Sequence, residues 1–191
     1  ALRQMGYQVK LLGDQEITKE NLTQFDAIIT GIRVYNTNER MKFHQLVLYE
    51  YVNNGGTLIV QYNTNSELYL SDLAPYSMKL SRDRVTKENA TITILKPDHW
   101  VLNKPNKITE KDFDGWVQER GLYFANQWDT TKLEAILACN DPNETAKDGG
   151  MLIGNYGKGK YIFSAYAWFR QLPAGVPGAY RIFANMIGGG K

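Results

Sequence analysis

Gly55-Gly56-Thr57-Leu58-Ile59-Val60-Gln61-Tyr62-Asn63 is the stretch that decides the fold of this chain. The two glycines are typical of a helix stop, the next four residues of a buried strand, and the last three of the start of a sharp turn. In many α/β hydrolytic folds, a turn of this kind presents a nucleophilic serine or cysteine. Here it carries amide and phenol side chains instead. The stretch therefore predicts the frame of an active site without its reacting group.

The segments before this strand complete a strand–helix–strand unit. Residues 26–31 form an almost continuously apolar run, which is typical of a strand covered on both faces. Apolar residues at helical spacing predict a helix over 39–52. This alternation predicts parallel strands joined by right-handed crossovers. Ligands of such sheets bind beyond the carboxyl ends of the strands, which are residues 31–36 and 61–63 here.

Both ends of the chain extend this pattern. Residues 7–12 alternate like a strand, and Thr18 begins a short helix over 18–22. The first six residues resemble the last turns of a helix that stops at Gly6, so we expect an N-terminal strand to be missing from this sequence.

A glycine turn predicts a β-hairpin from strands 151–155 and 160–166, before a final helix over 176–187.

The middle region, residues 67–128, is less regular, with a strand expected over 90–95 and another after it over 133–139. We therefore predict one α/β domain over 1–191. It would be a flavodoxin-like, mostly parallel sheet with helices on both faces, followed by a C-terminal β-hairpin and helix.

Composition limits the classes of function. With 22 basic and 20 acidic residues, the formal net charge is +2. A nucleic-acid binder normally shows a strong basic excess, so we expect no nucleic-acid partner. No apolar run approaches the roughly 18 residues of a membrane span. Aromatic residues make up 12% of the chain, a share that suits stacking on sugars or packing on a partner.

The sequence contains few groups suited to catalysis. Cys139 lies in an apolar run, which favours a buried structural thiol. His44 falls within the predicted long helix, on or near its surface, in a solvated or packing role. Asp98-His99 lies in a loop bounded by proline and could carry a proton, or Asp98 could cap a local turn. Two histidines so placed predict no metal cluster, and we expect no cofactor in this segment.

The region around Trp116 offers a further possibility. Asp112, Asp114 and Glu119 could form the paired carboxylates of a glycosidase, but sequence proximity does not set their separation. Arg120 could equally neutralise one of them in a structural ion pair. We favour the structural interpretation.

The order of the motifs resembles the class I glutamine-amidotransferase-like superfamily, and within it the trehalose-utilisation (ThuA-like) branch. The resemblance rests on residues 26–31, 55–60, 97–99 and 156–163. Amidotransferases of this superfamily use a cysteine at the strand–turn elbow and a His–Glu pair before the last helix. Here Tyr62 or Asn63 occupies the elbow and Ala167-Trp168 the second position, so covalent glutamine hydrolysis is not expected.

A narrower resemblance joins residues 74–86, 112–124 and 165–180 to the C-terminal domain of some bacterial LmbE/PIG-L-type deacetylases. It implies a parent that removes N-acetyl groups from amino sugars with zinc, in a separate N-terminal domain whose Ala-His-Pro-Asp-Asp type motif this sequence lacks. The chain would then be a non-catalytic accessory domain. Its partners would be the catalytic domain of the same polypeptide and a carbohydrate, in the periplasm of a bacterium or outside the cell.

The expected ligand-binding residues can hydrogen-bond to a sugar or stack on it, and loop packing or contact with the catalytic domain is their alternative role. They are Arg33, Tyr35, Asn36, Tyr62, Asn63, Trp116, Trp168, Arg170 and Gln171. Two other functions stay open. One is a ThuA-like sugar-processing enzyme that uses Asp98 and His99, and the other is a module for oligomerisation.

Overall fold

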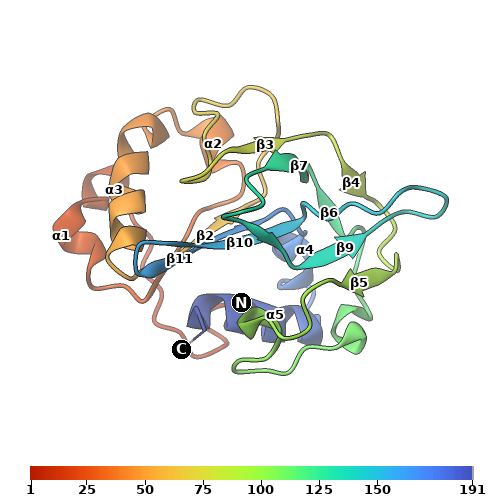
Figure 1. Ribbon diagram of the computed structural model, residues 1–191. Helices are drawn as coiled ribbons and strands as arrows, with labels where there is room; N and C mark the ends of the chain where they lie inside the picture. Colours follow the sequence, from red (N-terminus) through yellow and green to blue (C-terminus); the bar gives the residue numbers. More distant parts are fainter. Residues whose placement is uncertain (191) are drawn as a thin grey trace.

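A five-stranded sheet forms the centre of the protein, for which a computed structural model describes residues 1–190 (Figure 1). The strand order is β1-β2-β11-β10-β8, so the first two strands lie beside the C-terminal hairpin. The strands are β1 (Ala27–Ile29), β2 (Thr57–Gln61), β8 (Glu134–Ala135), β10 (Met151–Tyr156) and β11 (Gly159–Ser164).

Four of the five strands run in the same direction. β2 is parallel to β1, with Thr57 opposite Ala27, and it is parallel to β11, with Thr57 opposite Lys160. β10 is antiparallel to both β11 and β8, so β8 returns to the common direction. The predicted α/β class, the mostly parallel sheet and the C-terminal hairpin are therefore confirmed.

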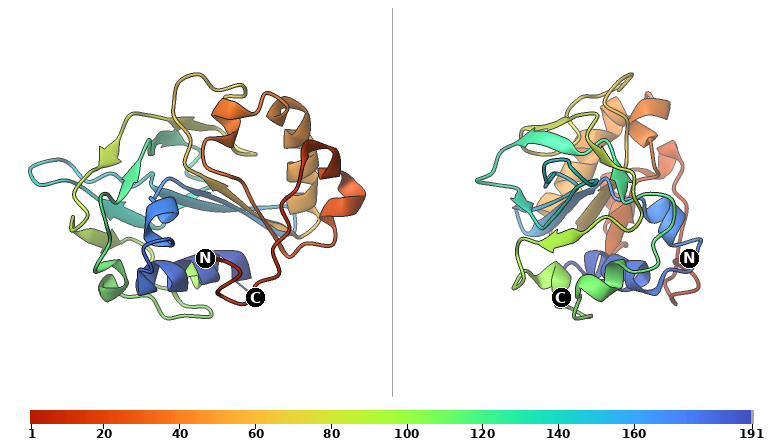
Figure 2. Two further views of the ribbon diagram at one scale, coloured as in Figure 1. Left: turned by 180° about the vertical axis from the view of Figure 1, so that it is seen from behind. Right: turned by 90° about the vertical axis from the view of Figure 1, so that its right-hand side faces the viewer.

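Helices cover both faces of the sheet. α3 lies on one face and α5 on the other (Figures 1 and 2). Both lie close to the expected ranges, and the Oγ1 of Thr18 accepts the N–H of Asn21 at 3.2 Å as the N-cap of α1. The helices are η1 (Asp14–Glu16), α1 (Lys19–Leu22), α2 (Val34–Thr37), α3 (Met41–Asn53), η2 (Trp100–Leu102), η3 (Glu110–Phe113), α4 (Trp168–Gln171) and α5 (Pro177–Gly188).

The middle region has more regular structure than its sequence indicates. Three antiparallel pairs, β3–β7, β4–β6 and β5–β9, extend away from α3 (Figure 1). Each pair joins residues at least 36 positions apart, from Val85 to Gly121 in the nearest case, so a local sequence pattern does not reveal the pairing. The strands are β3 (Met78–Leu80), β4 (Arg84–Val85), β5 (Ile92–Ile94), β6 (Gly121–Leu122), β7 (Ala125–Trp128) and β9 (Leu137–Cys139).

Two expectations about local structure are wrong. Residues 7–12 form no strand and pair with no described strand, although exposure alternates along residues 7–10. His44 is only 6% exposed, and its Nε2 lies 2.8 Å from Oδ1 of Asp14. The segment around η1 packs over this side of α3 and buries the imidazole, and the helical pattern alone could not show that contact.

The core is continuous through the sheet. Every residue from Thr57 to Val60 is buried, as are all six residues of 161–166. Close contact between the hairpin and the end of α3 requires glycine at position 159, where an added Cβ would lie 2.1 Å from the carbonyl oxygen of Val52. No helix among the described residues is long and apolar enough to cross a bilayer.

Candidate functional site

The carboxyl ends of β1, β2 and β11 lie at one end of the sheet, where the sequence predicts the ligand site. Asn63 occupies the elbow after β2 and is fully buried. Its Oδ1 accepts the N–H of Tyr35 at 3.0 Å, and its Nδ2 donates to the carbonyl oxygen of Gln61 at 2.8 Å. Both ends of this amide are therefore engaged in holding the turn.

Several of the expected ligand residues fill the space beneath this end of the sheet. The hydroxyl of Tyr35 donates to Oε1 of Gln45 at 2.7 Å, and burial raises the pKa of this phenol. Trp168 is fully buried, and its indole N–H donates to Oγ of Ser164 at 2.8 Å. Trp116 packs against it, with ring centroids 5.2 Å apart. These side chains are too deeply buried to meet a ligand.

Two of the other expected residues position loops at this end. Gln171 is fully buried and holds the loop over 117–119, because its Oε1 accepts the N–H of Val117 at 2.8 Å. Asn36 is half-buried, and its Nδ2 donates to the carbonyl oxygen of Ser66 at 2.9 Å. The expectation of direct ligand contact is thus corrected for Tyr35, Asn63, Trp116, Trp168 and Gln171, because their polar atoms already have partners inside the protein.

A surface patch remains above this packed layer. We call it the Tyr62 patch, and it consists of Arg33, Tyr62, Tyr123, Phe169 and Arg170. The ring of Tyr62 stacks on that of Phe169 with centroids 5.5 Å apart, and lies 5.8 Å from that of Tyr123. The guanidinium of Arg170 sits 5.1 Å from the centroid of the Phe169 ring. The patch therefore combines adjacent aromatic rings with cationic hydrogen-bond donors.

Charged groups surround the phenol of Tyr62. Partial burial raises its pKa, the neighbouring Tyr123 and Glu119 act in the same direction, and the cations of Arg33 and Arg170 oppose them. Nε of Arg170 also forms an ion pair with Oε1 of Glu119. A ligand at this patch would thus meet donors and an acceptor beside the aromatic rings.

The backbone around the patch adopts an uncommon conformation at three positions. Arg33, Gln118 and Tyr123 have φ values of 58°, 66° and 57°, in the left-handed region. Such residues cost about 1–3 kcal/mol each and cluster at functional sites in proteins. The N–H of Arg33 donates to the carbonyl oxygen of Tyr62 at 2.7 Å, which ties one of them to the turn after β2. The strain thus surrounds the Tyr62 patch.

The alternative site at Asp98 and His99 lies elsewhere. Nδ1 of His99 accepts the N–H of Val101 at 3.2 Å as the N-cap of η2, and burial lowers the pKa of the ring. Asp98 is exposed and has no hydrogen bond or ion pair with a described residue. The two side chains therefore form no proton relay.

Two of the three carboxylates near Trp116, those of Asp112 and Glu119, have structural partners, and Asp114 is exposed. Oδ1 of Asp112 accepts Nε of Arg181 at 2.7 Å, and Glu119 pairs with Arg170. Arg120 is buried, with its guanidinium bonded to the carbonyl oxygens of Ala90 and Phe113. The expected ion pair of Arg120 with one of these carboxylates is therefore wrong, because Arg170 and Arg181 pair with Glu119 and Asp112 while Arg120 binds backbone carbonyl oxygens. Among residues 1–190, no group of three or more His, Cys, Asp or Glu side chains could hold a metal ion.

Cys139 is buried, and its Sγ lies 3.6 Å from the hydroxyl of Tyr166. Burial raises the pKa of the thiol to about 11. Because only the thiolate reacts, we expect iodoacetamide to alkylate Cys139 roughly a hundredfold more slowly in the native protein than in urea at the same slightly alkaline pH. Mass spectrometry would measure both rates, and equal rates would contradict the assignment of Cys139 as a structural thiol.

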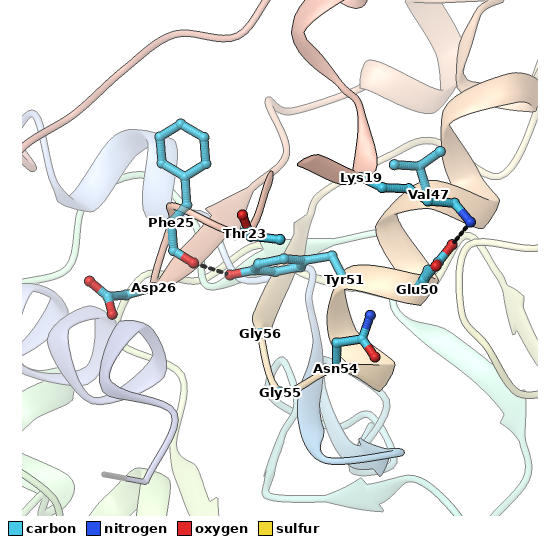
Figure 3. Close-up of a pocket in the computed structure, with 10 residues that line it drawn as sticks. All are labelled: Lys19, Thr23, Phe25, Asp26, Val47, Glu50, Tyr51, Asn54, Gly55 and Gly56. Carbon is cyan, nitrogen blue, oxygen red and sulfur yellow. Dashed lines mark hydrogen bonds and ion pairs between the residues drawn. The ribbon is translucent and has the colours of Figure 1, made fainter. Parts of the chain in front are cut away.

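Two cavities lie at the opposite end of the sheet, where the parallel strands begin. The smaller, of about 290 Å³, is shown in Figure 3 between α1, α3 and the residues before β1 and β2. An ion pair of Lys19 with Glu50 at 2.5 Å crosses its rim, and the hydroxyl of Tyr51 donates to the carbonyl oxygen of Phe25 at 3.0 Å. The larger, of about 740 Å³, contains His99.

No family model matches the sequence, and no curated protein matches it. Among solved structures, the fold is similar to that of Cytoplasmic Protein STM1381 from Salmonella typhimurium LT2, with a TM-score of 0.61, 17% identity, and coverage of 97% of this chain and 82% of that one. Cytoplasmic Protein STM3548 from Salmonella typhimurium gives a TM-score of 0.60 and 18% identity, with the same coverage.

A third structure, Gan42B, is a GH42 beta-galactosidase. It gives a TM-score of 0.51 and 14% identity over 87% of this chain, which corresponds to 22% of the Gan42B chain. At these identities the similarities show the fold alone.

Proposed function

We propose that this chain is a non-catalytic accessory domain that binds a saccharide at the Tyr62 patch. The observation that carries this proposal is the stack of Tyr62 on Phe169, flanked by Arg33 and Arg170 at the carboxyl ends of the parallel strands. Aromatic faces suit the apolar faces of sugar rings, and the adjacent charged groups suit the hydroxyls.

The chemistry at this end of the sheet favours binding over catalysis. The elbow after β2 carries Asn63, whose amide is fully engaged. A covalent hydrolase needs a nucleophile beside a base, and the thiol of Cys139 is buried in a different sheet with a raised pKa. Glu119 is held by Arg170. These facts support an accessory role.

The proposal also covers the family of this domain and the enzyme to which it would be attached. We propose a flavodoxin-like, amidotransferase-like arrangement related to the ThuA branch, attached to a zinc-dependent LmbE/PIG-L-type deacetylase of amino sugars. The match to about a fifth of a beta-galactosidase is consistent with an accessory part of a sugar-processing enzyme. The two Salmonella proteins are labelled cytoplasmic and give no support for export.

Calorimetric titration with an oligosaccharide of N-acetylglucosamine tests the proposed function. We expect Tyr62→Ala to weaken binding at least about tenfold, which corresponds to about 1.4 kcal/mol, because the stacking ring is lost. Tyr62→Phe keeps the ring and should bind nearly as well as the wild type. Phe43→Ala removes an exposed ring of α3 outside the patch and should change nothing.

The same samples should release neither acetate nor ammonia from the sugar. Equal affinity of Tyr62→Ala and the wild type would contradict binding at the patch. Turnover by the isolated chain would contradict the non-catalytic role.

A further inference from the structure

The larger cavity is a groove at the edge of the sheet, formed where β8, β10 and the start of β11 meet the segment before η2. Its volume of about 740 Å³ is within the usual range for small-molecule sites. The Tyr62 patch lies at the opposite end of the sheet, so the groove could bind a ligand independently of it. The residues that matter here are Tyr76, Lys96, His99, Lys132, Glu134 and Lys160.

Positive charge exceeds negative charge in the groove. Lys96 pairs with Glu134, with Nζ 3.3 Å from Oε2, so these two charges balance. Neither Lys132 nor Lys160 forms an ion pair with a carboxylate among the described residues. Lys132 also interacts electrostatically with Asp129, which does not line the groove. Neither ammonium group is therefore neutralised by a carboxylate that lines the groove.

Ring faces and amide groups hold these two ammonium groups in place. Nζ of Lys132 lies 5.9 Å from the ring centroid of Tyr76, and Nζ of Lys160 lies 6.0 Å from that of Trp100. Nζ of Lys160 also donates to Oδ1 of Asn155 at 2.6 Å. Cation–π contacts of this kind order a flexible side chain before a ligand arrives, which reduces the entropy lost on binding.

His99 adds a third donor to the groove. Since its Nδ1 accepts the N–H of Val101, the neutral ring carries its proton on Nε2. Burial is the main cause of the lowered pKa of this ring. Lys160 and Lys96 act in the same direction, and Glu134 opposes them. A bound anion would favour the charged form of the ring.

We propose that this groove binds the oxyanion of a small hydroxylated ligand, a sugar carboxylate or a sugar phosphate, through Lys132, Lys160 and His99. The hydroxyls of Thr130 and Thr131 and the amide of Asn155 line the same groove and can bind the hydroxyls of the ligand. The two anionic groups share this recognition chemistry, so direct comparison decides between them.

Calorimetric titration at low ionic strength with glucuronate, a hexose phosphate and glucose tests the groove. We expect at least one of the two anions to bind and glucose not to bind, and the tighter anion identifies the natural class. Lys132→Gln and Lys160→Gln should each weaken binding about tenfold, and added salt should weaken it further. Lys158→Gln removes an exposed lysine from the neighbouring turn and should have no effect.

Nuclear magnetic resonance provides a second measurement on the same protein. The pKa of His99 should rise when the anion binds, and it should rise less in Lys160→Gln, where less of the anion is bound at the same ligand concentration. Binding of neither anion, equal binding of glucose, or unchanged affinity in both glutamine variants would overturn the proposal. None of these outcomes depends on saccharide binding at the Tyr62 patch.

Discussion

Arg120→Met is expected to lower the free energy of unfolding by about 3 kcal/mol. The buried guanidinium donates to the carbonyl oxygens of Ala90 and Phe113 and lies 5.3 Å from the ring of Trp116. Methionine fills much of the volume but leaves both carbonyl groups without donors. Removal of a buried charge recovers some desolvation energy, yet the loss at two buried acceptors is larger.

Urea unfolding followed by tryptophan fluorescence measures this change. Arg82→Met is the matched control, because Arg82 is exposed and bonds to no described residue. Arg82→Met should change the free energy of unfolding by no more than about 0.5 kcal/mol. Equal stability of the two variants would show that Arg120 does not hold the segment before β5 and η3 together.

Gly178→Ala should destabilise the protein by about 3 kcal/mol. An added Cβ in the first turn of α5 would lie 1.9 Å from the carbonyl oxygen of Asp112. Since that atom belongs to the backbone of η3, the contact can be relieved only if the two helices separate. Their separation would also disturb the ion pair of Asp112 with Arg181.

Gly188→Ala, in the last turn of the same helix, is the control for this change. Its Cβ would meet only the Pro105 side chain, at 3.8 Å. Alanine is a better helix former than glycine, so a gain of about 0.5–1 kcal/mol is expected. Thermal unfolding of both variants should give shifts of opposite sign. Lower stability of both variants would mean that helix propensity and contact geometry do not explain the effects of alanine at Gly178 and Gly188.

The sequence predicts most of the central sheet because its signals are local. The glycine pair before β2, the apolar run before Gly31 and the glycine turn of the hairpin each act over a few residues. The β3–β7, β4–β6 and β5–β9 pairs bring together segments distant in sequence, so no local pattern identifies them. Residues 7–12 show the reverse case, in which a strand pattern is present and no described strand pairs with it.

The sequence places the expected site at the carboxyl ends of the parallel strands, but it does not show which side chains there contact one another. Chain order gives Arg33, Tyr62 and Arg170 their positions after strands, yet it does not show that Tyr35 and Trp168 are buried beneath them. Tyr123 and Phe169 were not expected, although Phe169 directly follows an expected residue. The lysines of the groove come from segments up to 64 residues apart, from Lys96 to Lys160, and only the folded chain brings them together.

Mapping of amide chemical shifts during titration with the N-acetylglucosamine oligosaccharide tests the proposed function most directly. We predict that the shifts concentrate at residues 31–33, 62, 119–123 and 169–170, around the Tyr62 patch. Shifts concentrated at the groove residues 130–134 and 154–160, or no shifts at all, would contradict saccharide binding at this end of the sheet.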